Sequence, residues 1–391
     1  MNRLSVGRHA VLVEAAEGYE VAEAPVYRGS RGPLFKTLLS TGCRMDCRYC
    51  PFSRLCRYPR ERWRPEKLVR VFLAAYRAGL VRGLFLSSGI YNDPERVSED
   101  VISVAEELRR RGYRGYIHLR LMPGTPGHLV RRALEVADRV GINLEAPGPS
   151  HFSEIAPSKG SWSLDIYSRL ALAARLAGDP RRVDTQLMVG ASGESDEETL
   201  TLLARLSRDG IGVVHFSPYQ PVPGTPLAER VRRPAPQWRA RLLYEAWSLI
   251  RSRAVDLDAF DPLLDAEGML PRPPRGKSLK EMLADAHPEW FPVDPSTAGR
   301  TMLLRVPGIG VKTADAIMRL RERGLLSLEA LRRLLGPRWR RASRFLDLTG
   351  LPRSSPSLPA LEEAEPPGGA VEEDSEPVKD LPPGEPLAPA V

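Results

Sequence analysis

Six strand-like segments separated by helix-like segments lie between residues 35 and 218, and this alternation constrains the fold more than any other feature. Each strand-like run is a short block of mainly apolar residues, and each helix-like run repeats apolar residues three and four positions apart. The strand-like runs are 35–42, 83–88, 115–122, 141–147, 183–190 and 211–218. The helix-like runs between them are 65–79, 94–112, 127–140, 163–178 and 195–210.

This alternation predicts parallel strands joined by right-handed helical crossovers. Six such units fit an α/β fold of the partial (β/α)6 TIM-barrel type, which we place at residues 34–228. A doubly wound sheet is the competing arrangement, and periodicity alone does not separate the two.

Three of the four cysteines, Cys43, Cys47 and Cys50, lie within eight residues directly after the first predicted strand. Thiolates bind iron–sulfur clusters and zinc. A structural zinc site needs four ligands, commonly from two separated CxxC pairs, and this loop supplies three. Cys56 is a possible fourth ligand, but its basic neighbours favour a non-ligand. Three ligands to a four-iron cluster would leave one iron open to a small chelating molecule.

The spacing CxxxCxxC, with the aromatic Tyr49 before the last cysteine, resembles the signature of the radical S-adenosylmethionine (radical SAM) superfamily. The resemblance implies a [4Fe–4S] cluster held by Cys43, Cys47 and Cys50, with S-adenosylmethionine chelated by the open iron. It also implies reductive cleavage of that cofactor to a 5′-deoxyadenosyl radical, while the protein holds the reactants and excludes side reactions. By the same resemblance, Tyr49 is expected near the adenine.

Other strand ends resemble the superfamily's cofactor-binding positions. Ser87-Ser88-Gly89 stands where a Gly-Gly-Glu motif is common, without its acid, and Gly190 opens a glycine-rich loop. Polar residues at strand ends are further candidates, because barrel chemistry gathers there, although they equally fit a structural role at the barrel rim. The predicted cofactor-binding residues are Tyr49, Ser87, Ser88, Gly89, Arg120, Asn143, Glu145, Gln186 and Gly190. No catalytic residue is assigned.

The polar segment 147–162 predicts a surface loop or a substrate lid, with His151 and Lys159 as candidate functional residues. The six histidines are scattered along the chain without metal-ligand spacing. We therefore expect none of them to be a metal ligand.

A second motif, LLRVPGIGVKTADAIM, predicts a short helix over 296–304, a turn at Pro307-Gly308-Ile309-Gly310 and a helix from Lys312. The amides of such a turn and of the following helical turn can face a phosphate. The pattern resembles the helix-hairpin-helix motif of DNA-binding and repair proteins; a hairpin that only packs or binds protein is the alternative. The predicted nucleic-acid-binding residues are Pro307, Gly308, Ile309, Gly310, Lys312 and Thr313.

The charge distribution also favours a polyanionic partner. Residues 296–350 carry twelve bases and four acids, whereas residues 351–391 carry nine acids and two bases. The net charge of +8 therefore conceals a charge of +15 on the first 350 residues. Arginine used only for solubility is the alternative. The expected partners are a nucleic acid, with DNA favoured over RNA, through residues 296–350, and an electron donor such as a flavodoxin or ferredoxin.

A radical SAM barrel joined to such a hairpin resembles a bacterial family associated with DNA modification or repair, and we expect that function here. Acting on a base inside a duplex would require base flipping or a single strand. The alternatives are an RNA-modifying enzyme, or an enzyme on another substrate with the hairpin as a protein-binding module. Base-excision glycosylases are excluded, because their cluster cysteines follow the hairpin, whereas Cys43 to Cys50 precede it.

Five regions are expected along the chain: an extension at 1–33, the barrel at 34–228, a helical and loop connection at 229–293, the hairpin module at 294–350 and a tail at 351–391. The tail contains ten prolines and many acids and predicts disorder. The chain has no long apolar run and no signal-like N-terminus. We therefore expect a cytoplasmic protein without a membrane span.

Overall fold

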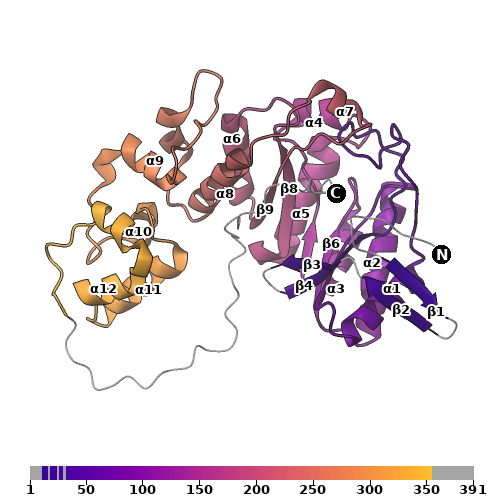
Figure 1. The fold of residues 1–391 in the computed structure, drawn as a ribbon, viewed down its shortest axis with the longest axis horizontal. Helices are drawn as coiled ribbons and strands as arrows, with labels where there is room; N and C mark the ends of the chain where they lie inside the picture. Colours follow the sequence, from indigo (N-terminus) through magenta and orange to yellow (C-terminus); the bar gives the residue numbers. More distant parts are fainter. Residues whose placement is uncertain (1–10, 16–17, 24–25, 30–31, 355–391) are drawn as a thin grey trace. The chain divides into compact units, whose positions relative to one another are not determined.

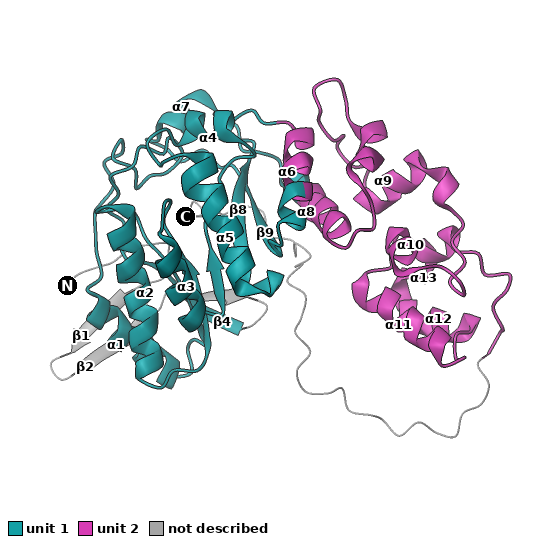
Figure 2. Cartoon of the chain, turned by 180° about the vertical axis from the view of Figure 1, so that it is seen from behind, with its two compact units in different colours: residues 1–194, 205–240, 378–391 teal, residues 195–204, 241–377 magenta. Residues whose placement is uncertain are grey.

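The computed structural model describes residues 11–15, 18–23, 26–29 and 32–354 (Figure 1). Most of the predicted acidic tail lies outside the described residues. The described chain divides into two compact units (Figure 2): its residues up to 194 and residues 205–240 form the first, and residues 195–204 and 241–354 form the second. Each unit is described by itself.

The first unit is built on a seven-stranded sheet whose strands follow one another in chain order. The strands are β3 (Val26–Gly29), β4 (Gly32–Leu38), β5 (Gly83–Ser87), β6 (Tyr116–Arg120), β7 (Arg139–Gly141), β8 (Val183–Val189) and β9 (Val213–Pro218). Strands β4 to β9 are parallel, and β3 pairs antiparallel with β4 at the edge. A separate antiparallel hairpin joins β1 (Val11–Ala15) and β2 (Gly18–Glu23).

The sheet order decides between the two predicted arrangements. A doubly wound sheet reverses its strand order at a switch point, whereas β4 to β9 run in sequence without reversal. The six parallel strands therefore form a partial TIM barrel, as the alternation predicts.

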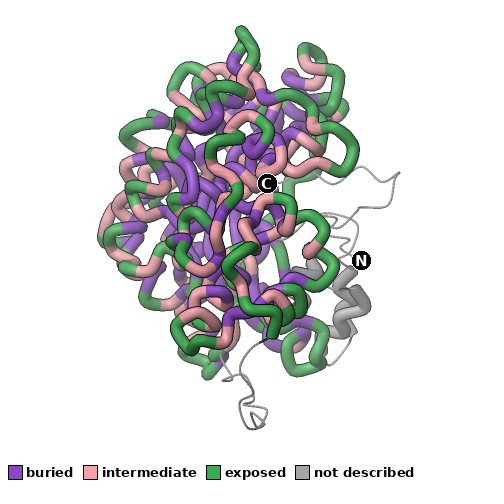
Figure 3. The backbone as a smooth tube through the Cα atoms, turned by 90° about the vertical axis from the view of Figure 1, so that its left-hand side faces the viewer, coloured by how far each residue is buried: buried purple, intermediate pink, exposed green. Residues whose placement is uncertain are grey.

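Amphipathic helices connect the strands. They are α1 (Pro65–Arg77), α2 (Pro94–Arg110), α3 (Gly127–Val136), α5 (Ser168–Ala177) and α6 (Asp196–Arg208). Helix α1 packs on α2, α2 on α3 and α3 on α5, so these helices form a layer alongside the strands (Figure 1). Their apolar stripes are buried; in α1, Leu68, Val69 and Phe72 have no exposed surface. Figure 3 shows such buried stretches interrupted by exposed turns along the chain.

The predicted strand over 141–147 is wrong in extent, because β7 covers only Arg139–Gly141. Beyond it the chain continues beside β8 with irregular pairing: the Glu145 amide donates to the Gln186 carbonyl at 2.9 Å, and the Met188 amide donates to the Glu145 carbonyl at 2.9 Å. Glu145 adopts a left-handed backbone with φ of 65°. This conformation breaks the strand periodicity, and the residue pattern does not reveal it.

The predicted loop over 147–162 contains a short helix, α4 (Pro149–Ile155). The predicted helix over 163–178 begins instead as a π-helical turn, Trp162–Tyr167, and continues as α5. After β9 follow the short helix α7 (Pro226–Arg230) and α8 (Gln237–Arg251). No helix among the described residues is long and apolar enough to cross a membrane.

The second unit is helical between residue 241 and the end of the described chain, with no strand of its own. Its principal helices after α8 are α9 (Leu279–Ala286), α10 (Arg300–Arg305), α11 (Val311–Glu322), α12 (Leu328–Leu335) and α13 (Trp339–Ala342). Helix α10 begins four residues later than the prediction, and α11 begins one residue earlier. Both flank the glycine turn at 306–310, and Ile309 of the turn is buried, as are Leu303 of α10 and Ile317 of α11.

Candidate active site

A pocket that is open to solvent lies at the carboxyl ends of β4 to β7. Ten of the predicted site residues line it: Cys43, Cys47, Tyr49, Cys50, Ser87, Ser88, Gly89, Arg120, Asn143 and Glu145. Lys159 lines it as well, whereas Gln186 and Gly190 do not. The structure thus brings together residues from four strand ends at one site.

The three cysteines of the loop after β4 share this cavity. Burial raises the pKa of the Cys47 thiol to about 11 and that of Cys50 to about 12. Such thiols are neutral at physiological pH unless a metal centre stabilises the thiolate. The Ile90 amide donates to the Cys43 sulfur at 3.4 Å, which fixes this side chain from the neighbouring strand end.

The donor set fits a cluster better than a single ion. Among the residues that the structure describes, no three Cys, His, Asp or Glu side chains converge on one point where a metal ion would bind. The three thiols line the same pocket, and cysteine thiolates are the usual protein ligands of a multi-iron cluster. A tetrahedral zinc site would require closer convergence and a fourth ligand.

Cys56 lies outside the cavity. It is buried, and its thiol donates to the carbonyl oxygens of Cys50 at 3.5 Å and Gly224 at 3.4 Å. These hydrogen bonds hold the Cys56 thiol away from the cavity, in agreement with the prediction that Cys56 is not a cluster ligand.

Gly89 is where the second strand end meets the cysteine loop. Its amide donates to the Ser40 carbonyl at 2.7 Å. A Cβ at Gly89 would lie 2.6 Å from the Gly42 carbonyl oxygen. A glycine is therefore required here by the close approach of the cysteine loop, whatever the cavity holds.

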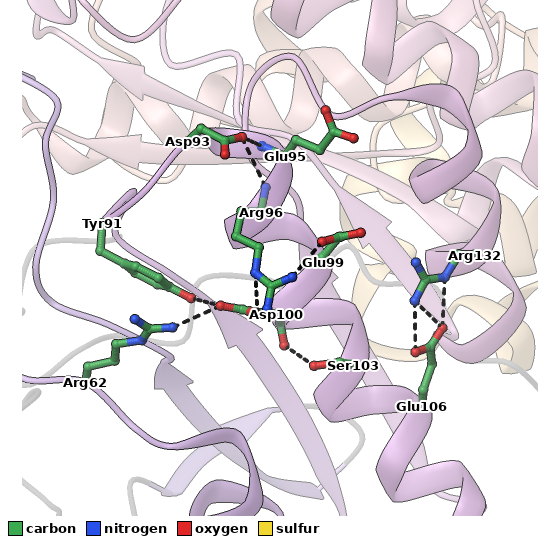
Figure 4. A network of polar contacts seen from close by, with 10 residues as sticks. All are labelled: Arg62, Tyr91, Asp93, Glu95, Arg96, Glu99, Asp100, Ser103, Glu106 and Arg132. Carbon is green, nitrogen blue, oxygen red and sulfur yellow. Dashed lines mark hydrogen bonds and ion pairs between the residues drawn. The ribbon is translucent and has the colours of Figure 1, made fainter.

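The loop from Gly89 to Tyr91 is braced from behind by helix α2, as Figure 4 shows. The Tyr91 hydroxyl donates to Asp100 at 2.5 Å, and Arg62 donates to the same carboxylate at 3.0 Å. The Arg62 guanidinium also stacks over the Tyr91 ring at 3.7 Å. Sequence reasoning missed this brace, since the three residues belong to three different segments.

Arg120 reaches the cavity from β6 and is held by Asp184 of β8. Its guanidinium donates to the Asp184 carboxylate at 2.9 Å, and His118 and His215 contact the same carboxylate at 3.0 and 3.1 Å. Arg120 and the two histidines hold the pKa of the Asp184 carboxyl well below its usual value despite complete burial. Asp184 was missed by sequence reasoning, although it shares a strand face with Gln186 two residues on.

Two predicted residues have buried polar atoms without a partner in the described structure. They are the Asn143 amide oxygen, in the cavity wall, and the Gln186 amide nitrogen. Buried polar groups are nearly always hydrogen-bonded. An acceptor without a partner in the wall of a cavity fits a ligand that brings a donor, as a cofactor with amino and hydroxyl groups does.

The glycine-rich loop after β8 is held together by hydrogen bonds to the carboxylate of Glu194, which belongs to the same loop. The Glu194 carboxylate accepts from the amides of Gly190 and Ser192 and from the Ser192 hydroxyl at 2.9 Å. His151, the other candidate from segment 147–162, contacts the Ser192 carbonyl at 3.2 Å. Neither residue 151 nor 190 reaches the cavity wall.

The turn at 306–310 of the second unit carries the residues predicted to bind nucleic acid. Gly308 has φ of 91°, and Gly310 precedes α11 without a capping side chain. Lys312 is exposed in the first turn of α11. Thr313 is buried, and its hydroxyl accepts from Arg338 at 3.1 Å, so its expected hydrogen bond is internal.

The sequence profile described as "Radical SAM superfamily" matches residues 37–206. The chain is 26% identical over 230 residues to a Pyrococcus horikoshii protein named "Probable threonylcarbamoyladenosine tRNA methylthiotransferase", covering 55% of this chain and 52% of that protein. It is also 26% identical over 235 residues to a ribosomal protein uS12 methylthiotransferase of a Synechococcus species, covering 56% of this chain and 49% of that protein. The chain thus spans about half the length of these relatives.

Among solved structures, methylornithine synthase superposes with a TM-score of 0.43 and 20% identity, covering 56% of this chain and 62% of that chain. The region that matches the radical SAM superfamily profile, residues 37–206, includes Cys43, Cys47 and Cys50. Enzymes of that superfamily use a [4Fe–4S] cluster and S-adenosylmethionine.

Proposed function

We propose, from the radical SAM domain at 37–206, that this chain is an enzyme that cleaves S-adenosylmethionine reductively and uses the product to modify RNA. The observation that carries the first part is that three thiols from one loop line the same open pocket. When bound, the reduced cluster and the cofactor supply a 5′-deoxyadenosyl radical, which abstracts hydrogen from a substrate.

The chain's own residues supply the binding site. Cys43, Cys47 and Cys50 hold the cluster, and the Asn143 amide oxygen accepts a hydrogen bond from the cofactor. Arg120, oriented by Asp184, offers a guanidinium to a carboxylate in the cavity. Apolar side chains on the same wall, including Leu121 and Met122, exclude water around the reacting atoms.

Gln186 and Gly190 stay proposals for a cofactor-bound state, because neither lines the cavity as it stands. The Gln186 amide nitrogen has no partner in the described structure, so a small shift of its side chain would let it donate to a ligand.

RNA is preferred over the DNA expected from sequence. One relative is named for modification of a tRNA nucleoside, and the comparisons give DNA repair no support. The hairpin of the second unit supports a nucleic-acid partner of either kind, because an uncapped helix start with an exposed lysine faces phosphate readily. We therefore propose a helix-hairpin-helix function for 306–313, gripping the phosphate backbone of RNA.

The test is anaerobic reconstitution of the full chain with iron and sulfide, followed by dithionite and S-adenosylmethionine. Formation of 5′-deoxyadenosine is measured alone and with RNA, single-stranded DNA and duplex DNA. We expect RNA to stimulate turnover most. Equal stimulation by duplex DNA would favour DNA as the substrate, as the sequence predicts. No cleavage of S-adenosylmethionine under any condition would contradict the assignment as an enzyme.

The hairpin is tested separately by binding. Lys312→Glu should weaken RNA binding about tenfold at low salt, because it reverses the charge at the start of α11. Arg323→Glu is the matched control, since it makes the same charge change at the exposed end of the same helix. Equal affinities of wild type and Lys312→Glu would favour a protein-binding hairpin, the remaining alternative, which the relative named for a ribosomal protein also fits.

A further inference from the structure

A buried ion pair shares the cavity wall with the three cysteines. The Lys159 ammonium lies 2.6 Å from the Glu145 carboxylate, and their side chains are only 16% and 4% exposed. Both residues line the cavity together with Cys47 and Cys50. The cofactor-binding role predicted for Glu145 does not require a lysine beside it. The position of Lys159 next to this carboxylate therefore indicates a further role for the pair.

The segment that carries Lys159 is fastened to the cysteine loop. The Ser158 amide and hydroxyl donate to the Asp46 carboxylate at 2.9 and 2.7 Å, and the Asp46 amide donates back to the Ser158 hydroxyl at 3.1 Å. The Arg48 amide donates to the Ile155 carbonyl at 2.7 Å. Asp46 and Arg48 flank Cys47 in sequence, so these bonds fix the position of the lysine relative to the thiols.

The Glu145 carboxylate is also held in a fixed position. Glu145 holds a left-handed backbone with φ of 65°, a conformation that is strained for a non-glycine residue. Its backbone is paired with β8 on both sides at 2.9 Å. Burial, and then the charge of the same carboxylate, raises the pKa of Tyr49 well above its usual value, so the two groups lie close together. The strained conformation therefore delivers the Glu145 carboxylate to a point between Tyr49 and Lys159.

We propose that Lys159 and Glu145 form a charge pair that sets the reduction potential of the iron–sulfur cluster, an inference that rests on the proposed function. A cluster with three thiolate ligands gains one negative charge when it is reduced. The Lys159 ammonium stabilises the reduced form, and the Glu145 carboxylate opposes it. Such charges act strongly in a buried site, because little solvent screens them.

Because the two side chains carry opposite charges, removing one charge or the other should shift the cluster's reduction potential in opposite directions. Glu145→Gln keeps the side-chain shape and removes only the negative charge, so the cluster potential should rise above that of wild type. Adding Lys159→Met to Glu145→Gln removes the positive charge in a protein that no longer contains the carboxylate. The potential of this double variant should fall below that of Glu145→Gln alone.

The potentials are measured by electron paramagnetic resonance during redox titration of the anaerobically reconstituted full chain. S-adenosylmethionine is left out, so that loss of a cofactor contact cannot cause the shift. Arg54→Met is the matched control: Arg54 pairs with Asp46 at 3.0 Å beside the same loop, but its side chain is 56% exposed. Solvent screens that charge, and we expect a smaller shift.

Equal potentials of Glu145→Gln and the double variant would overturn the inference. If Lys159→Met prevents cluster assembly, Lys159→Gln takes its place in the double variant and must show the same fall. A wild-type protein that assembles no cluster at all would instead contradict the proposed function, so the two failures are distinguishable.

Discussion

At the scale of single residues, Cys50 and Cys56 provide the simplest contrast. They lie six positions apart, but Cys50 faces the cavity and Cys56 donates its thiol proton to two carbonyls. Cys50→Ala should lose most of the bound iron after anaerobic reconstitution, whereas Cys56→Ala should retain it. Iron and sulfide analysis checks this, and loss of the cluster from both variants would make Cys56 a ligand.

Gly141 is a second residue whose type is dictated by its surroundings. A Cβ at this position would overlap the Asp184 carboxylate and the Arg120 guanidinium, which cross directly over it. Gly141→Ala should therefore destabilise the fold by about 1–3 kcal/mol, the usual cost of overpacking. Urea unfolding measures this cost. Gly148→Ala is the control, since its Cβ would meet no atom within 4 Å, and a Gly141→Ala protein as stable as this control would contradict the packing.

His118 predicts a pH dependence of stability. Burial lowers its pKa from 6.5 to about 4, even though it faces the Asp184 carboxylate with Arg120 and Arg139 nearby. The folded pKa lies below the unfolded one, so the stability that neutral His118 contributes is complete above pH 6.5 and is lost as the pH falls towards 4. Between pH 7.5 and pH 5 this loss amounts to about 2 kcal/mol.

Urea unfolding of the metal-free full chain at these two pH values checks the prediction against His118→Gln. The variant should show a correspondingly smaller loss of unfolding free energy over the same interval. Identical losses in both proteins would show that the pKa of His118 is the same in the folded and the unfolded chain.

At the scale of elements, helix α2 supports the cysteine loop through the brace of Tyr91 and Asp100 (Figure 4). Tyr91→Phe removes the hydroxyl that bonds to the carboxylate and should cost about 1 kcal/mol. It should also speed the release of iron to a chelator, because Ile90, beside Tyr91, donates to the Cys43 sulfur.

The same helix supplies the control for this prediction. Glu106 pairs with Arg132 at 3.0 Å, but both side chains are more than a third exposed. Breaking this pair with Glu106→Gln should change neither stability nor iron release measurably. Iron release from Tyr91→Phe at the wild-type rate would mean that the brace does not support the cluster.

The elements also show how far sequence reasoning reaches. The alternation of apolar runs predicts all six parallel strands, because strands that are buried on both faces consist of continuous apolar residues. It fails over 141–147, where Glu145 leaves the strand with a positive φ that only tertiary contacts impose. Ten of the predicted site residues meet in one cavity because the ends of parallel strands share an edge. Asp184 and the pair of Tyr91 and Asp100 were not predicted, since their roles arise from contacts between distant segments.

At the scale of the whole molecule, the first unit holds the predicted radical chemistry, and the second holds the basic hairpin. The expected domain boundaries, including 228 and 294, stay predictions, as does the disorder of the tail. The basic charge of residues 296–350 predicts that RNA binding weakens steeply with salt, since phosphate contacts release counterions. Measuring affinity across a salt series checks this, and a flat dependence would point away from nucleic acid.

The central claim is that three cysteines hold a [4Fe–4S] cluster with one iron open to S-adenosylmethionine. The most direct test is electron paramagnetic resonance of the dithionite-reduced, anaerobically reconstituted full chain, recorded before and after addition of the cofactor. The account predicts the signal of a reduced [4Fe–4S] cluster that changes when S-adenosylmethionine binds and is absent from Cys50→Ala. A cluster signal that the cofactor leaves unchanged, or zinc in place of iron, would contradict it.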